Sequence, residues 1–88
     1  MADHTVTFAR SARKELEQLP DEIAGRILER IENLAVQPRP PGVVKLIGGK
    51  NLWRIRVGDY RVVYAIDDTQ RLVDISVIRH RREVYRGL

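Results

Sequence analysis

The residues best suited to chemistry in this sequence are arginines that alternate with apolar side chains. Arg54 and Arg56 alternate with Trp53, Ile55 and Val57. Successive side chains of an extended strand point to opposite faces, so both arginines are expected to project from one face while the apolar residues pack on the other. Guanidinium groups match the geometry of phosphate and stabilise charge that develops on it. The pattern therefore predicts a cationic sheet face that suits a polyanionic partner.

Three further residues extend this candidate site. Arg61 lies just across a turn, and its alternation is compatible with the same face, whereas His80 and Tyr85 belong to a basic tail at 79–88. Cleavage of RNA by its own 2′-hydroxyl needs a base, cations around the phosphate and an acid for the leaving oxygen. Histidine titrates near neutrality and tyrosine can donate a proton or stack on a base. The plainer interpretation is a solvated basic surface, with Arg61 in a structural ion pair.

Several other kinds of site are not expected. The chain has no cysteine and only two histidines, which argues against disulfides and against a zinc site. No glycine-rich loop follows a strand and opens a helix, so a nucleotide cradle is unsupported. The two serines have no neighbouring His and Asp with which to form a hydrolase triad. We therefore expect neither a metal nor a cofactor.

Size and charge narrow the class of protein. With 88 residues, 43% of them apolar, the chain is expected to form one domain with a modest core. Residues 1–44 carry six Lys or Arg against seven Asp or Glu, whereas residues 45–88 carry ten against five. The positive charge thus belongs to the second half. The sequence lacks a long apolar run and a signal-peptide pattern at its start, so a cytoplasmic location without membrane contact is expected.

The first half is expected to form a strand followed by a helical hairpin. Residues 5–8 are β-branched and aromatic, which favours a strand. Residues 10–19 carry apolar side chains at helical spacing, and so do residues 21–35. The stripe of the second helix comprises Ile23, Ile27, Leu28, Ile31, Leu34 and Ala35. The proline-rich run at 38–42 ends this helix.

The second half changes to the period of strands. Strands are expected at 43–47, 52–57, 60–66 and 72–78, with a tight turn at Gly58-Asp59 between the second and third of them. The predicted fold class is α+β: a small antiparallel sheet, including the N-terminal strand, with the two-helix hairpin packed on one face. Trp53, Tyr60 and Tyr64 are expected to pack in the core or the hairpin, so Trp53 is not interpreted as a platform for stacking bases.

Two segments together resemble the RelE/ParE superfamily of toxins. The first is the hairpin LWRIRVGDYRVVY at 52–64, and the second is HRREVYR at 80–86, similar to the family's closing His-Arg-x-x-x-Tyr-Arg segment. The order of strand, two helices and further strands is also that of the family, so the resemblance covers nearly the whole chain. It implies a RelE-like toxin, a small ribonuclease that enters the ribosomal A site, cuts mRNA and is neutralised by a cognate antitoxin.

The resemblance also implies roles for individual residues. The implied catalytic set is Arg54, Arg56, Arg61, His80, Arg81 and Tyr85. The remaining cations implied to bind RNA are Lys45, Lys50, Arg79, Arg82 and Arg86. This sequence has Arg at positions 54 and 56 where Lys occurs in the best-known members, so these two residues are assigned to charge stabilisation rather than proton transfer. Which of Arg79, His80 and Arg81 occupies the critical place in the tail is left open.

Two other functions fit the same resemblance. One is a ParE-like protein that inhibits DNA gyrase by binding and does not cleave RNA. The other is a degenerate toxin that binds only its antitoxin and operator DNA. For the nuclease, the expected partners are the antitoxin, the ribosome and mRNA, with operator DNA reached only through the antitoxin complex. The antitoxin is expected to be acidic where it touches the toxin.

Overall fold

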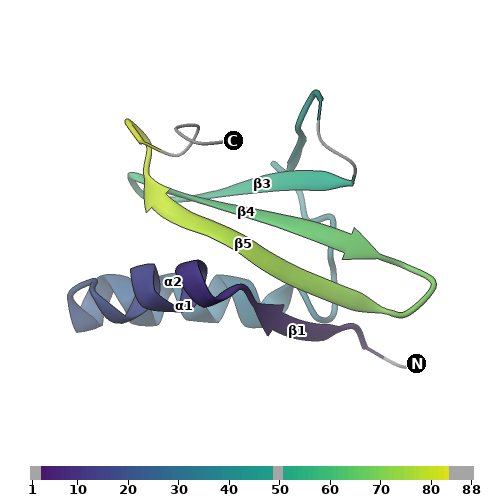
Figure 1. Cartoon of the computed structure of the whole chain (residues 1–88), viewed down its shortest axis with the longest axis horizontal. Coiled ribbons are helices and arrows are strands. Elements are labelled where there is room, and N and C mark those ends of the chain that lie inside the picture. The colour runs from purple at the N-terminus through teal and green to yellow at the C-terminus, as the bar shows by residue number, and fades with distance from the viewer. Residues whose placement is uncertain (1–2, 49–50, 84–88) are drawn as a thin grey trace.

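A five-stranded sheet with two helices on one side forms the molecule in this computed structural model, which describes residues 3–48 and 51–83 (Figure 1). The elements in chain order are β1 (Thr5–Phe8), α1 (Arg10–Glu17), α2 (Asp21–Asn33), β2 (Val44–Lys45), β3 (Leu52–Val57), β4 (Tyr60–Asp67) and β5 (Leu72–His80). The strand order is β1-β5-β4-β3-β2. The predicted strand, helical hairpin and α+β class are therefore confirmed.

The sheet is mixed, which corrects the expectation of an antiparallel one. β1 pairs in parallel with β5, from Thr5 opposite Leu72 to Phe8 opposite Ile75, while the other neighbouring strands are antiparallel. Parallel pairing needs a long connection between the two strands, and everything from α1 to β4 supplies it here. The strand expected at 43–47 is confined to Val44–Lys45, so β2 covers only part of the outer edge of β3.

The main core lies between the helices and the sheet. Ala12 of α1 and Ile27 and Ile31 of α2 are fully buried against apolar side chains of β3, β4 and β5. Burial of a large aliphatic side chain stabilises the fold by about 1.5–3 kcal/mol. Leu28, which the sequence placed on the buried stripe, is 39% exposed. It stands about 100° around the helix from Ile27 and therefore turns toward solvent.

The opposite face of the sheet has a smaller apolar cluster. Val63 of β4 and Val77 of β5 are buried there, and Leu46 and Leu52 pack partly against them. The register of β4 with β5 slips at this point, since Val63 lies opposite Val77 but Tyr64 lies opposite Ile75. Ser76 is left without a partner, as in a β-bulge. From Val77 onward, each residue of β5 therefore points to the face opposite to the one that simple alternation along the strand predicts.

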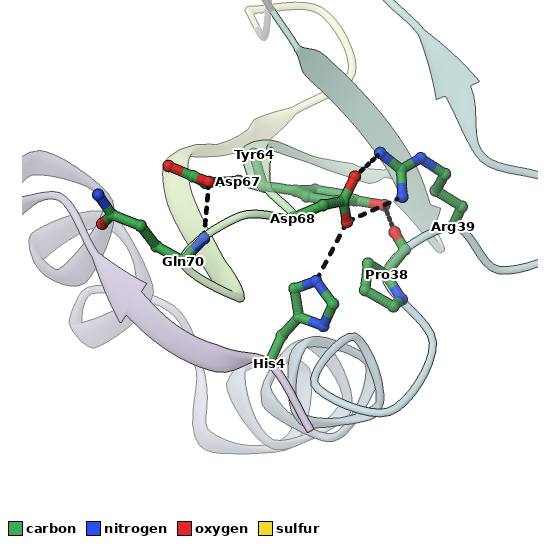
Figure 2. A network of polar contacts seen from close by, with 7 residues as sticks. All are labelled: His4, Pro38, Arg39, Tyr64, Asp67, Asp68 and Gln70. Carbon is green, nitrogen blue, oxygen red and sulfur yellow. Dashed lines mark hydrogen bonds and ion pairs between the residues drawn. The ribbon is translucent and has the colours of Figure 1, made fainter. Parts of the chain in front are cut away.

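A polar network joins the turn between β4 and β5 to the N-terminal region and to the loop after α2 (Figure 2). Asp68 Oδ2 accepts a hydrogen bond from Arg39 Nη2 at 2.9 Å, and Asp68 Oδ1 lies 3.2 Å from His4 Nε2. The hydrogen bond from Arg39 holds the pKa of Asp68 below its usual range, and the one from His4 acts in the same direction. The network thus connects three segments at one end of the sheet, and the β3–β4 turn lies at the other end.

Tyr64 of β4 holds the loop after α2 through a hydrogen bond. Its buried hydroxyl donates a hydrogen bond of 2.7 Å to the carbonyl oxygen of Pro38 (Figure 2). Burial raises the pKa of Tyr64 to about 12. The adjacent Arg39 guanidinium lies over Trp53, 4.9 Å from the ring centroid, and Trp53 packs half-buried against the main core. Trp53 and Tyr64 thus have the packing roles that the sequence predicted.

The turn between β3 and β4 depends on Gly58. Val57 pairs with Tyr60, which leaves Gly58 and Asp59 as a two-residue turn. The φ of Gly58 is +59°, and Asp59 is not among the residues with positive φ. Positive φ at the first turn position alone is the pattern of a type II′ turn, in which glycine is preferred.

Among the described residues, no helix is long and apolar enough to cross a membrane.

Two glycine substitutions are expected to change stability in opposite directions. A Cβ at Gly58 or at Gly25 of α2 would meet no heavy atom within 4 Å, so only the backbone decides the sign. Gly58→Ala is expected to lower the free energy of unfolding by about 1 kcal/mol because of its positive φ. Gly25→Ala is expected to raise it by about 0.5–1 kcal/mol because alanine favours a helix. Urea unfolding measures both, and equal shifts in one direction would contradict this account.

Candidate nucleic-acid interface

Three arginines form a row across the face of the sheet that the helices leave open. Arg56 of β3 lies opposite Arg61 of β4, and Arg61 lies opposite Arg79 of β5. Residues directly opposite each other in antiparallel strands point to the same face with Cβ atoms about 5 Å apart. The structure therefore brings the predicted Arg56 and Arg61 together and adds Arg79 to them. Like charges in this arrangement repel, and a bound anion relieves the repulsion.

Arg61 is the central and most buried member of the row. Only 9% of the surface of Arg61 is exposed to solvent. Nη1 donates to the carbonyl oxygens of Gly58 at 3.3 Å and Tyr60 at 3.2 Å. The β3–β4 turn thus fixes the guanidinium in place. Arg61 has the structural role that the plainer interpretation gave it, through the carbonyl oxygens of the turn, and it still lies between two other cations.

Arg79 is tied to the first helix. Its Nε donates to Glu15 Oε2 of α1, and Glu15 Oε1 accepts the backbone N–H of Ile78 at 3.2 Å. β1 ends at Phe8, so no strand of the described residues borders the edge of β5 beyond Ile75, and Glu15 pairs with part of that edge. The same carboxylate orients Arg79 and offsets part of its charge. Arg79 therefore contributes less free positive charge to the row than Arg56 does.

Arg54 and Arg56 differ from Arg61 and Arg79 in the contacts of their side chains. Both lie on β3, and within the described residues neither forms an ion pair with a carboxylate. The Nε atom of Arg54 is buried and has no hydrogen-bond partner. Arg54 lies opposite Val63 of β4, on the same face as the row. Both arginines that the sequence assigned to charge stabilisation are thus available to an anion.

His80 is not on the arginine face. It lies opposite Tyr60, which packs against the main core, and the two rings meet edge to face with centroids 5.6 Å apart. The unpaired Ser76 is the reason, because it puts Arg79 on the open face and His80 on the helix side. His80 Nδ1 also accepts the backbone N–H of Arg82 at 3.3 Å. The structure therefore separates His80 from Arg56 and Arg61.

The tail begins beside the β3–β4 turn. The backbone N–H of Arg81 donates to the carbonyl oxygen of Asp59 at 2.8 Å, which brings the start of the tail to the same end of the sheet as the arginine row. The side chains of Arg81 and Arg82 are exposed there. The predicted site residues Lys50, Tyr85 and Arg86 lie outside the described residues.

Lys45, predicted to bind RNA, lies away from the row. It pairs with Trp53 and therefore shares the helix-side face, with Nζ 5.7 Å from the centroid of the indole ring. One residue that the sequence analysis missed is Arg30 of α2, which lines a groove together with Arg54 and Arg56. In the sequence it is an ordinary polar position of an amphipathic helix, so no local signal marks it.

The chemistry of the open face follows from these placements. It offers guanidinium groups to a phosphodiester, and among the described residues it carries neither histidine nor tyrosine. No group of three or more His, Asp or Glu within 3–48 and 51–83 is placed to hold a metal ion. The described part of the face is therefore equipped to bind phosphate and to stabilise its developing charge.

Comparisons with known proteins agree with this fold and with the family resemblance of the sequence. Residues 6–85 match the family model described as the ParE toxin of type II toxin–antitoxin systems, parDE. The toxin RelE of Mycobacterium tuberculosis is 37% identical over 82 residues, which cover 92% of this chain and 84% of that protein. The toxin RelG of the same organism is 32% identical over 84 residues, covering 94% and 97%.

Solved structures of toxin–antitoxin complexes also contain chains with a similar sequence and fold. The archaeal RelE–RelB complex from Pyrococcus horikoshii OT3 contains a chain that is 31% identical to this one, with a TM-score of 0.80. The match covers 90% of this chain and 96% of that chain. The RelBE2 complex from Mycobacterium tuberculosis contains a chain that is 30% identical with a TM-score of 0.78, covering 89% and 98%.

The different environments of Arg56 and Arg61 predict different effects on stability. Arg61→Ala is expected to lower the free energy of unfolding by about 1–2 kcal/mol, because it leaves turn carbonyls without their donor. Arg56→Ala is expected to leave it within about 0.5 kcal/mol of the wild type, because it removes an exposed like charge. Urea unfolding followed by the fluorescence of Trp53, the one tryptophan of the sequence, measures both. Similar losses in both variants would show that Arg61 has no special structural role.

Proposed function

The chain belongs to the RelE/ParE superfamily of type II toxins, and from this premise we propose that it is an endoribonuclease that cuts mRNA in the ribosomal A site. The observation that carries the proposal is the row of Arg56, Arg61 and Arg79 on an open sheet face. The relatives named RelE and RelG, each more than 30% identical to this chain, support the RelE-like assignment.

In the proposed reaction the 2′-oxygen of the RNA bonds to the adjacent phosphorus while the bond to the 5′-oxygen breaks. A proton leaves the 2′-hydroxyl and another is delivered to the departing 5′-oxygen. Arg54 and Arg56 hold the phosphate and stabilise its extra negative charge, since no carboxylate among the described residues pairs with either of them. Arg61 keeps the hairpin in shape and adds a fixed positive charge beneath the phosphate.

Proton delivery to the departing 5′-oxygen is assigned to the tail. Arg81 starts next to the turn through its hydrogen bond to Asp59, and Tyr85 follows four residues later as the proposed proton donor or stacking partner. His80 lies on the opposite face from the phosphate proposed on Arg54 and Arg56, so it does not reach the adjacent 2′-hydroxyl. The proton of that hydroxyl is proposed to leave to solvent water. The proposed reaction uses no metal, because arginines supply the positive charge.

We also propose that a cognate antitoxin covers the arginine face. The archaeal RelE–RelB complex and the RelBE2 complex are toxin–antitoxin assemblies of similar chains. Arg54 and Arg56 favour an acidic segment, because carboxylates would neutralise cations that have no partner in the chain described here. Operator DNA is reached through this complex, and action on ribosomes places the toxin in the cytoplasm.

A gyrase-directed activity is the competing function. The matching family model is described as the ParE toxin, but the relatives named RelE and RelG do not favour this activity. It predicts arrest of DNA synthesis with intact mRNA, whereas the nuclease predicts arrest of translation with cut mRNA.

The first test is induction of the wild-type protein and of Arg56→Ala in cells, with labelling of translation and DNA synthesis. Primer extension on a reporter mRNA with and without ribosomes locates the cuts. We expect ribosome-dependent cuts from the wild type, and a loss of about 10²–10³-fold in Arg56→Ala, because one charge-stabilising group is removed. Arg13→Ala, which removes an exposed arginine of α1, is the matched control and is expected to cleave normally.

Two results would contradict the nuclease proposal. Early arrest of DNA synthesis with an intact reporter would support the gyrase-directed activity instead. Normal growth on induction of the folded wild-type protein would exclude both toxic activities and favour a chain that only binds its antitoxin. Tyr85→Ala in the same assay tests the assignment of the tail.

Antitoxin binding is expected to depend on salt. Steered association of a basic face with an acidic segment slows steeply as ionic strength rises, so a fall of at least about tenfold in the association rate is expected between low and high salt. Arg56→Ala is expected to reduce this dependence. Surface plasmon resonance with the immobilised antitoxin measures it, and rates insensitive to salt would overturn the electrostatic account.

A further inference from the structure

A basic groove lies along the outer edge of β3, beyond the point where β2 stops pairing with it. β2 pairs with β3 at Arg54 and Trp53, and no strand of the described residues pairs with the outer edge of β3 from Ile55 onward. Gly42, with a φ of +89°, belongs to the loop that precedes β2. The result is a groove of about 410 Å³. Its lining residues are Arg30, Pro41, Gly42, Arg54, Ile55 and Arg56.

Three of the residues that line this groove are arginines. Arg30, Arg54 and Arg56 line it without any carboxylate, and within the described residues none of the three forms an ion pair. The buried Nε of Arg54 is a donor without a hydrogen-bond partner. A buried donor in this state is unfavourable by about 1–3 kcal/mol.

The main chain adds a further donor at the same place. Leu46 N–H donates to Leu52 O at 2.9 Å, so Leu52 directs its polar backbone groups toward the β2 side. In antiparallel strands this direction repeats every second residue, and it is therefore shared by Arg54 and Arg56. β2 pairs with Arg54, but no described strand pairs with the outer edge at Arg56. The backbone N–H of Arg56 thus faces the open edge beside the groove.

We propose that this groove binds a backbone phosphate of the RNA next to the phosphate held on the arginine row, with Arg30 as a binding residue. The inference rests on the proposed nuclease function. Arg56 belongs both to the row and to the groove, so it provides a continuous cationic path from the sheet face over the edge of β3 to α2. Guanidinium forks and a backbone N–H match phosphate oxygens.

RNA suits the groove better than a protein segment does. Only Pro41 and Ile55 contribute apolar residues to its lining, so it lacks the large apolar pocket in which a protein partner would anchor a side chain. A carboxylate of the antitoxin is the competing occupant. It would use the same guanidinium groups, and the test below distinguishes the two.

The test measures binding of a short single-stranded 2′-O-methyl RNA, which lacks the attacking hydroxyl, by fluorescence anisotropy over a range of salt concentrations. Arg30→Ala is expected to weaken binding about tenfold at low salt. It is also expected to reduce the slope of log K against log salt by about 0.7, the value for one phosphate contact with a single strand. Arg30→Lys keeps the charge and loses the fork, so it should retain most of the slope.

Arg13→Ala is the control, since it removes one exposed helical arginine outside the groove. Urea unfolding of both alanine variants checks that the fold is kept. An unchanged affinity and slope in folded Arg30→Ala would overturn the subsite even if the wild type cleaves mRNA, and the proposed function would stand. A loss of antitoxin binding without a loss of RNA binding would assign the groove to the antitoxin instead. Absence of both RNA binding and cleavage in the wild type would overturn the subsite and the proposed function together.

Discussion

The hydrogen-bond register of β3, β4 and β5 is the constraint on which the candidate site depends. It places Arg56, Arg61 and Arg79 side by side, although the first and the last lie 23 positions apart in the sequence. Such a row repels itself, and the buried apolar layer under α1 and α2 supplies the stability that holds it together. Because the helices occupy one face only, the other face is free to present the charge.

The three cations of the row are not equivalent, and their differences follow from what surrounds them. Arg61 is held by turn carbonyls and Arg79 by Glu15, so both are fixed and partly compensated. Within the described residues Arg56 has neither restraint, and Arg56, Arg54 and Arg30 carry charge without an ion-pair partner toward the open edge of β3. The compensated arginines thus shape the site, while the uncompensated ones are the groups that an anion would bind.

Much of this architecture is readable from local patterns. The alternation at 52–57 and 60–66, the proline run after α2 and the glycine at position 58 predict the hairpin and its two faces. The apolar spacing in both helices predicts their buried sides, apart from Leu28. Parallel pairing of β1 with β5 is not readable in this way, because it depends on which sheet edge remains open after the other strands have paired.

The sequence by itself therefore determined the elements, the basic second half and the cationic face of β3, since each depends on neighbours within a few residues. The tertiary structure alone decided the composition of the site. An unpaired Ser76 moved Arg79 onto the open face and His80 away from it, and no alternation rule signals that change. Packing of α2 beside the free edge of β3 brought Arg30 to Arg54 and Arg56. Both outcomes come from pairing between distant segments, which the order of residues in one strand does not encode.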